Sequence, residues 1–383
     1  MVFYQEREEA RKGIYMIGIL TYHTGYNYGA SLQNYALQKV IEKMGFECET
    51  INFETEEFVA NREMFSRHPR RMKEVIKVIS RLPYYNSLKR RQYLFDKYTN
   101  ECLKISPLYR TEQQVIDHAS DYNCIVCGSD QIWNVSEAAA EAANYIYFLN
   151  FPKKQRRISY AASFGPWVKE APLHENEFLP WLKQFDSISV RETSGVAYVK
   201  SLGLNCELCL DPTVLLDKED YDAICAKRLV DNKYILMFGW NTNDDLIKAA
   251  KKASEELSLP VLNIVPPPRG IGSGIKRKLD VGPCEFLSMI KNAEFIVTNS
   301  FHGTAFSVTY EKPFVSIVSN NKPDLRMESL LKQLGLDDNL TGADDFDVET
   351  ILNTDFRSVA DKKRLLRKSS LDYLTKALNG LEK

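Results

Sequence analysis

The residues of this sequence that could do chemistry stand directly after short apolar runs. His302, one of five histidines, lies in the segment NSFHGTAF, between an apolar run and small residues typical of a helix start. Ser300, Gly303 and Thr304 surround it, and the free amides of a helix start favour an anion. A histidine beside a bound phosphate can donate a proton. We therefore predict that His302 is functional, with a structural histidine as the alternative.

Two charged residues follow other apolar runs. Asp130, in GSDQIWN, could accept a proton from a substrate hydroxyl, and Trp133 could offer its indole to the face of a sugar. Arg191 ends the run SISVR, and its guanidinium can bind carboxylate or phosphate through two parallel hydrogen bonds. The alternatives are that Asp130 caps a helix, that Trp133 belongs to the core, and that Glu192 is a surface partner of Arg191.

The loop after the first apolar run, TYHTGYNYGA, is a second candidate binding segment. Its glycines would let backbone amides approach a ligand, and Asn27 and Tyr28 offer hydrogen bonds. The alternative is a turn with a helix cap. The residues predicted to contact an acceptor are Asn27, Tyr28, Gly29, Trp133 and Asn134.

Further cations could complete an anion site. Lys322 and Arg326 follow the apolar run PFVSIVS, and Arg269 lies in PPPRGIGSGIK, whose glycine spacing does not match a dinucleotide fingerprint. The residues predicted to bind a donor are Arg191, Lys322, Ser300, Gly303, Arg326 and Arg269.

The elements that must position these residues follow a repeated strand and helix pattern. Apolar runs at 15–22 and 47–53 flank a segment with helical periodicity at 30–46, which predicts a βαβ unit. The same pattern restarts after residue 217. We predict an α/β fold with two Rossmann-like domains facing a cleft, since ligands of such folds bind past the carboxyl ends of the strands. The predicted parts are 1–212 on the acceptor side, 213–350 on the donor side, and a C-terminal helical segment, 351–383.

The segment 66–98 departs from the average composition, with ten basic and two acidic residues. Met72, Val75, Ile76 and Ile79 form an apolar stripe at helical spacing. A basic amphipathic helix can lie on anionic lipid, and the alternative is a helix that faces the core with a solvated charged side. If it binds lipid, replacing Arg70, Arg71, Arg90 and Arg91 by Glu should abolish binding to anionic vesicles.

The composition of the chain argues against a nucleic-acid-binding, membrane-spanning or secreted protein. The chain has 383 residues, 44% hydrophobic and 26% charged, with a net charge of −1, which gives no general attraction to nucleic acid or membrane. No apolar stretch is long enough to span a bilayer, and the N-terminus is charged where a secretory signal is apolar. We expect a cytosolic protein that has no nucleic-acid partner.

The pairs Cys124/Cys127 and Cys206/Cys209 look like halves of a zinc site. Both lie in runs that we predict to be strands, where residues three apart point to opposite faces. We therefore expect buried thiols and no metal.

Taken together, these segments are similar to the polysaccharide pyruvyltransferase family. The matching pieces are TYHTGYNYGASLQNYAL, VCGSDQIWN, YAASFG, SVRE, LDPTVLL and NSFHGTAFSVTYEKPFVSI. The resemblance implies a fold similar to the GT-B glycosyltransferases and transfer of pyruvate from phosphoenolpyruvate to two sugar hydroxyls, with no cofactor besides this donor. It implies that His302 protonates the donor, that Asp130 is the base, and that Arg191 and Lys322 bind the donor's anionic groups.

One position departs from the family pattern. Some members carry an arginine two residues before the histidine, where this chain has Ser300. The phosphate would then be held by Lys322, Arg326 or the helix amides.

The function expected from the sequence is pyruvyl transfer in the synthesis of a capsular or other surface polysaccharide. The basic segment adds a lipid-linked acceptor and peripheral contact with the inner face of an anionic membrane to this expectation. The alternatives are a GT-B-type glycosyltransferase that uses a nucleotide sugar and a non-catalytic module that binds zinc or a partner.

Overall fold

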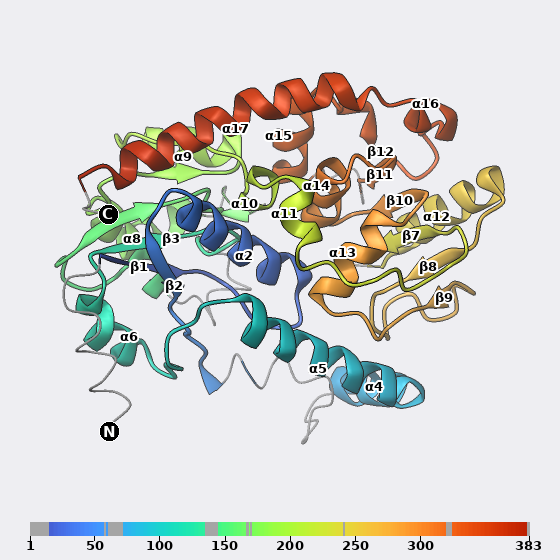
Figure 1. Ribbon diagram of the computed structural model, residues 1–383, viewed down its shortest axis with the longest axis horizontal. Coiled ribbons are helices and arrows are strands. Elements are labelled where there is room, and N and C mark those ends of the chain that lie inside the picture. The colour runs from blue at the N-terminus through green and yellow to red at the C-terminus, as the bar shows by residue number, and fades with distance from the viewer. Residues whose placement is uncertain are drawn as a thin grey trace.

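The computed structural model describes residues 15–56, 59, 72–134, 145–165, 168, 171–239, 242–318 and 324–380. Figure 1 shows helices packed around two sheets that lie at opposite ends of the molecule. The expected α/β architecture with two Rossmann-like units is confirmed, because strands pair in parallel within each sheet. Lys322 and residues 66–71 lie outside the described residues, so the calls on them stay predictions.

The first sheet has the strand order β2-β1-β3-β4, and all of its pairs are parallel. Isolated parallel bridges link its β4 side to the two-stranded sheet β5-β6, at Ile158 with Ser187 and at Ala162 with Val190. The strands are β1 (Met16–Leu20), β2 (Glu47–Thr50), β3 (Cys124–Cys127), β4 (Arg156–Ser159), β5 (Ser189–Val190) and β6 (Glu207–Leu208).

The second sheet has the order β12-β11-β10-β7-β8-β9, again with parallel pairs. Its central strands are buried on both faces, which explains why they are continuous apolar runs in the sequence. The strands are β7 (Ile235–Phe238), β8 (Val261–Asn263), β9 (Lys276–Arg277), β10 (Phe295–Thr298), β11 (Phe314–Ile317) and β12 (Leu340–Thr341).

Helices cover both sheets and join them. The largest apolar cluster contains side chains of both halves, such as Tyr28 and Phe286, whose rings stack 4.5 Å apart. The helices are α2 (Tyr28–Lys43), α4 (Met72–Arg81), α5 (Tyr85–Cys102), α6 (Glu112–His118), α8 (Glu175–Leu182), α9 (Thr193–Ser201), α10 (Pro212–Leu215), α11 (Lys218–Asp222), α12 (Asp244–Leu257), α13 (Pro283–Lys291), α14 (Phe301–Thr309), α15 (Leu325–Leu334), α16 (Val348–Leu352) and α17 (Phe356–Leu378).

The long C-terminal helix α17 runs along one side of the molecule, from the second sheet toward the first (Figure 1). Tyr373 donates from its hydroxyl to the carbonyl of Ser159 at 2.8 Å, and Ser370 accepts at its Oγ from the amide of Leu210 at 2.9 Å. Its last turns therefore pack against the first sheet.

The two cysteines of each pair, which lie in β3 or flank β6, pack into different apolar clusters. Cys124 and Cys209 belong to one apolar cluster, whereas Cys127 and Cys206 belong to another. All four thiols are buried and none forms a disulfide. Neither pair presents both sulfur atoms to one point.

The basic segment forms α4 and α5, and one of its bases is not at the surface. Arg91 is 4% exposed, and its guanidinium lies 4.4 Å from the ring centre of Tyr28. Treating Arg91 as a lipid-binding surface cation is wrong, because its head group is enclosed between α2 and the second half. Arg91 contacts the Tyr28 hydroxyl and the carbonyl of Ile264.

Candidate functional site

The predicted chemistry-bearing residues meet where strands of the two sheets end. Asp130 follows β3, Arg191 follows β5, and His302 lies in the first turn of α14, after β10. At the start of α14, the Ser300 Oγ accepts a hydrogen bond from the Gly303 amide at 3.5 Å. Ser300 and Gly303 therefore cap the helix in this structure.

His302 crosses from the second half to touch the first. Asn27 caps α2, since its Oδ1 accepts from the Gly29 amide at 3.0 Å and from the Ala30 amide at 3.4 Å. A Cβ atom built on Gly29 would lie 1.9 Å from His302 Nδ1, so only glycine leaves room for the imidazole. The glycine expected to admit a ligand instead admits this ring.

The other ring nitrogen of His302, Nε2, differs from Nδ1 in its surroundings. His302 is 7% exposed, and its Nε2 is buried without a hydrogen-bond partner among the described residues. A buried polar atom of this kind usually has a partner, so Nε2 is a candidate contact for a ligand. Burial lowers the pKa of His302, while the neighbouring carboxylates of Asp211 and Asp130 act to raise it. A negatively charged ligand would raise that pKa further and favour the imidazolium.

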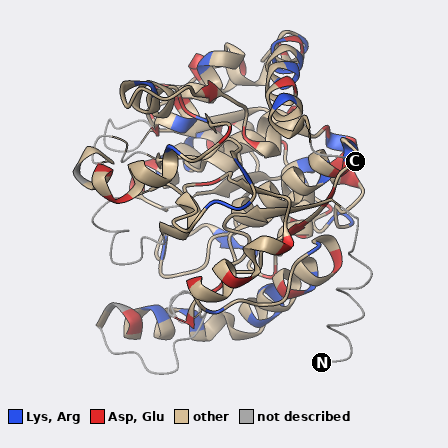
Figure 2. Ribbon diagram, turned by 90° about the vertical axis from the view of Figure 1, so that its left-hand side faces the viewer, with Lys and Arg blue, Asp and Glu red and all other residues tan. Residues whose placement is uncertain are grey.

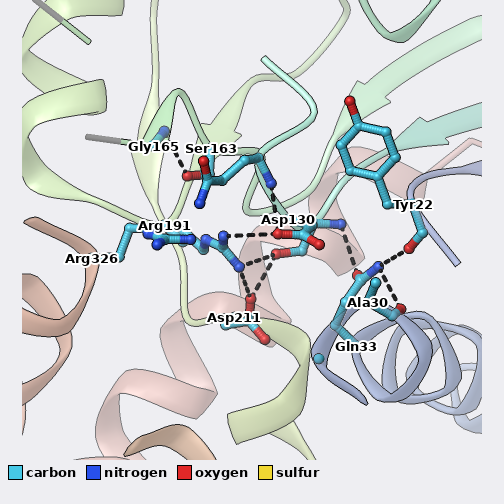
Figure 3. A network of polar contacts seen from close by, with 12 residues as sticks. Tyr22, Ala30, Gln33, Asp130, Ser163, Gly165, Arg191, Asp211 and Arg326 are labelled. Atoms are coloured by element: carbon cyan, nitrogen blue, oxygen red, sulfur yellow. Dashed lines mark hydrogen bonds and ion pairs between the residues drawn. The ribbon is translucent and has the colours of Figure 1, made fainter. Parts of the chain in front are cut away.

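Arg191 is the centre of a buried polar network (Figure 3). Its Nη1 donates to Asp211 Oδ2 at 2.6 Å, and its Nη2 lies 3.4 Å from Asp130 Oδ1. The Ser129 Oγ donates to the same Asp211 oxygen at 2.7 Å, and the Ser129 amide donates to Gln33 Oε1. The network thus ties the start of α2 to the loop after β3.

The charges of this network shift the pKa values of its carboxyls in opposite directions. Burial alone would raise the pKa of Asp211, but Arg191 and His302 outweigh it, and the pKa falls to about 2. Burial raises the pKa of Glu192 to about 7, against the opposing effect of Arg191 and Arg326. Asp211 is therefore an anion at neutral pH, whereas Glu192 exchanges its proton near pH 7. The interpretation of Glu192 as a surface residue is wrong, because it is fully buried.

Arg326 approaches the same place from α15. Its Nε donates to Asp324 Oδ1 at 2.8 Å, and a second bond joins its Nη2 to Asp324 Oδ2. The Phe301 ring centre lies 5.7 Å from the guanidinium carbon of Arg326 and 4.6 Å from that of Arg191. Phe301 thus separates the two like charges by packing against both.

Two residues predicted to contact an acceptor are buried in the core. Trp133 is 0% exposed, its ring stacks on Phe148, and its Nε1 donates to the carbonyl of Tyr147 at 3.0 Å. Tyr28 is 2% exposed, and its hydroxyl donates to the carbonyl of Val281 at 3.0 Å. Neither ring has a face open to a sugar, so the prediction that Trp133 and Tyr28 contact the acceptor is wrong. Trp133 is a core residue, which was the alternative interpretation of its position.

Of the remaining predicted residues, Asn134 lies near Arg326, whereas Arg269 lies in a loop beside α4. In one orientation of the Gln131 amide, its Oε1 accepts from the Nδ2 of Asn134 at 3.0 Å; in the opposite orientation, this oxygen accepts from the guanidinium of Arg326 instead. Arg269 is an exposed residue in the loop between β8 and β9, close to Lys77 and Arg81 of α4. Its assignment as a donor ligand stays a prediction.

Sequence reasoning missed Asp211, Gln33 and Ser129. Asp211 had a usable signal, because it follows the apolar run NCELCL directly, and Asp130 likewise comes soon after the run CIVC, with Gly128 and Ser129 between them. Gln33 and Ser129 had none, since a polar side chain on the buried face of a helix or in a loop reveals its partners only in three dimensions.

The comparisons with known proteins identify the family of this chain. The model of the family described as polysaccharide pyruvyl transferase matches residues 27–321, a range that contains Gly29, Asp130, Arg191, Asp211 and His302. The chain belongs to the polysaccharide pyruvyl transferase family. The expected family resemblance is thereby confirmed for most of the chain.

Solved structures similar to this pyruvyl transferase family member share only a small part of its sequence. The UDP-GlcNAc 2-epimerase of Methanocaldococcus jannaschii is 11% identical, with 93% of this chain and 99% of that chain covered, at a TM-score of 0.47. The E. coli heptosyltransferase WaaC is 11% identical, with 80% of this chain and 90% of that chain covered, at a TM-score of 0.36. No curated protein matches the sequence.

Proposed function

We propose that this protein transfers pyruvate from phosphoenolpyruvate onto two hydroxyls of a sugar and releases phosphate. Family membership supports the reaction class. The observation that carries the site assignment is the position of His302: the charges of Asp130 and Arg191 act on its imidazole, and its Nε2 has no hydrogen-bond partner among the described residues.

In the proposed reaction, the His302 imidazolium protonates the methylene carbon of the donor, and carbon 2 becomes electrophilic. A first sugar hydroxyl attacks carbon 2 and loses its proton to Asp130. The bond between carbon 2 and the phosphate oxygen then breaks, and phosphate leaves with the proton from Asp130. A second hydroxyl attacks carbon 2, and its proton restores the imidazolium. The products are a cyclic ketal and inorganic phosphate.

Binding the donor requires the site to accept a carboxylate and a phosphate. The described residues of the cluster hold two guanidinium groups, from Arg191 and Arg326, beside the carboxylates of Asp130, Asp211 and Asp324. Both Nη atoms of Arg191 face carboxylates, while its buried Nε has no partner among the described residues. We assign the donor's carboxylate to Arg191 and its phosphate to Arg326 and Lys322, because Ser300 stands where some members of the family have arginine.

The acceptor belongs to the proposal only as a class. We assign it to a sugar of a surface polysaccharide, including sugars carried on a lipid. Asn27 and Asn134 remain acceptor candidates, since both lie at the edge of the cluster and neither is buried.

Phosphate release tests this function. The protein is incubated with phosphoenolpyruvate and each of a panel of galactosides, mannosides and lipid-linked oligosaccharides. Phosphate should appear only when an acceptor is present, and His302→Ala should abolish release in a protein that still unfolds cooperatively. Substantial turnover by His302→Ala would remove it as the acid. Protection from heat by nucleotides, with no phosphate release, would favour the nucleotide-sugar glycosyltransferase, and stoichiometric zinc in the purified protein would favour the zinc module.

A further inference from the structure

The side-chain amide of Gln131 lies between two parts of the candidate site. It is within hydrogen-bond distance of Asn134 on one side and of the Arg326 guanidinium on the other. With its oxygen toward Arg326, Oε1 accepts from Nη1 at 2.5 Å and from Nη2 at 3.0 Å. The opposite orientation would set the NH₂ group of Gln131 against the guanidinium, and both groups are donors. The oxygen of Gln131 therefore faces Arg326.

The contacts of Arg326 leave little of its guanidinium for a ligand. A guanidinium has five N–H groups and binds a phosphate best through two parallel ones. Asp324 accepts from Nε at 2.8 Å and from Nη2, while Gln131 accepts from the second N–H of Nη2 and from one N–H of Nη1. Among the described residues, the other N–H of Nη1 has no partner. A two-point bond to phosphate therefore requires Asp324 or Gln131 to leave.

Gln131 is the partner that can leave. The bonds between Asp324 and Arg326 join opposite charges, and Asp324 Oδ1 also accepts from the backbone amide of Arg326 at 3.0 Å as the cap of α15. Asp324 thus holds both the guanidinium and the start of its helix. Gln131 is neutral and half-buried, so its bond to the cation is the weaker of the two.

The surroundings of Gln131 limit how its side chain can move. A Cβ atom built on Gly165 would lie 2.5 Å from an atom of the Gln131 amide, so the chain at Gly165 closes that side. The backbone of Gln131 is held by Asp130, whose Oδ1 accepts from its N–H at 2.8 Å, and by the N–H of Asn134, which donates to its carbonyl at 3.2 Å. Asn134 is half-buried and lies on the other side. The side chain can therefore turn toward Asn134 while Asp130, the proposed base, stays in place.

The rest of the molecule differs from this buried cluster of charges. Figure 2 shows basic and acidic residues interspersed over the ribbon, in keeping with the net charge of −1. Within the described residues, no helix is long and apolar enough to cross a membrane. Because the net charge is close to zero, the attraction for an anion comes from local groups such as Arg326.

We propose that Gln131 is a positioning residue that occupies the end of the Arg326 guanidinium and yields it to the donor's phosphate. When the phosphate binds, the oxygen of Gln131 loses its bonds to Nη1 and Nη2, and the side chain turns toward Asn134. The two N–H groups then donate to two phosphate oxygens. Gln131 acts through Arg326, without touching the reacting atoms. The inference rests on the proposed function, since phosphoenolpyruvate brings the phosphate.

Isothermal titration calorimetry of the full-length protein tests the proposal, with phosphoenolpyruvate and inorganic phosphate as separate probes. Gln131→Ala should bind both anions about tenfold more tightly than the wild type, because no carbonyl has to be displaced. Gln131→Glu should bind both at least about tenfold more weakly, because a carboxylate pairs with Arg326 more firmly than an amide does. Gln131→Ala should also lower the free energy of unfolding in urea, since Arg326 loses a partner.

Opposite shifts in affinity and stability distinguish this role from a structural one, because a residue that only supports the fold would lower both when it is removed. The matched control is Gln113, an exposed residue of α6 that donates to Asp117 at 2.7 Å. Gln113→Ala should bind both anions as the wild type does.

Equal or weaker binding of both anions by Gln131→Ala would overturn the proposal, and so would a wild type that binds neither anion. Tighter binding of inorganic phosphate by Gln131→Ala, with no binding of phosphoenolpyruvate to either protein, would support the role of Gln131 and contradict phosphoenolpyruvate as the donor. Failure of this inference and failure of the proposed function therefore give different results.

Discussion

The contact between Gly29 and His302 leads to a quantitative prediction for Gly29→Ala. The added methyl carbon would lie 1.9 Å from His302 Nδ1, whereas non-bonded heavy atoms rest about 3.5 Å or more apart. Either the imidazole or the start of α2 must therefore move by about 1.5 Å. Neither partner can give way easily, because the ring is buried and Asn27 caps the helix.

Two effects of opposite sign decide the stability of this variant. Alanine is favoured over glycine within a helix by up to about 1 kcal/mol. Overpacking a buried site costs about 1–3 kcal/mol. We expect the second effect to win, with a net loss of about 1 kcal/mol or more. Movement of the imidazole by more than about 1 Å should also lower the rate of phosphate release by about 100-fold.

A double-mutant cycle isolates the contact. In the His302→Ala background the methyl group has space, so Gly29→Ala should leave stability unchanged or raise it. The coupling free energy between the two positions, measured by urea unfolding, should reach about 2 kcal/mol. If Gly29→Ala changes the free energy of unfolding equally in both backgrounds, within about 0.5 kcal/mol, the two residues do not touch and this reasoning is refuted.

Three other variants test the buried network and the core. Asp211→Asn should lower the free energy of unfolding by about 3–5 kcal/mol, because the buried charge of Arg191 loses one of its anionic partners. In the wild type, the stability that Asp211 contributes should be lost as the pH falls from 3.8 toward about 2. Acid unfolding monitored by circular dichroism measures both effects. The pKa of Glu192 is raised from 4.5 to about 7. The stability that its protonated form contributes is therefore fully present below pH 4.5 and falls by about 3 kcal/mol as the pH rises to about 7. Glu192→Gln should remove this dependence and be the more stable protein in urea above about pH 7, and an unchanged slope would contradict the assignment. Trp133→Ala should cost about 3–5 kcal/mol by opening a core cavity, and a variant that unfolds like the wild type but binds sugar weakly would restore the indole as a sugar platform.

Much of the fold was predictable from sequence because buried parallel strands are continuous apolar runs. The runs around β3 and β10 stand out for that reason, and they are followed by Asp130 and His302, the proposed base and the proposed acid. The carboxyl-end rule then selects Asp130 and His302 without a structure.

Side-chain direction was not predictable in the same way. Trp133 lies three residues beyond Asp130, and nothing in the sequence distinguishes an indole that faces the site from one that faces the core. Arg91 resembles its neighbour Arg90 in sequence, yet only Arg91 points inward, onto Tyr28. The contact between Gly29 and His302 depends on how two separately encoded halves pack, which local patterns do not specify.

The most direct test of the account is a crystal structure of the protein with phosphoenolpyruvate bound. We predict that the methylene carbon of the donor lies within about 3.5 Å of His302 Nε2, the distance of a reactive contact. The donor's carboxylate should face the Nε of Arg191, and its phosphate should face Arg326. A donor bound away from His302, or a His302 Nε2 that is hydrogen-bonded to the protein when the donor is present, would contradict the claim that this imidazole is the proton donor.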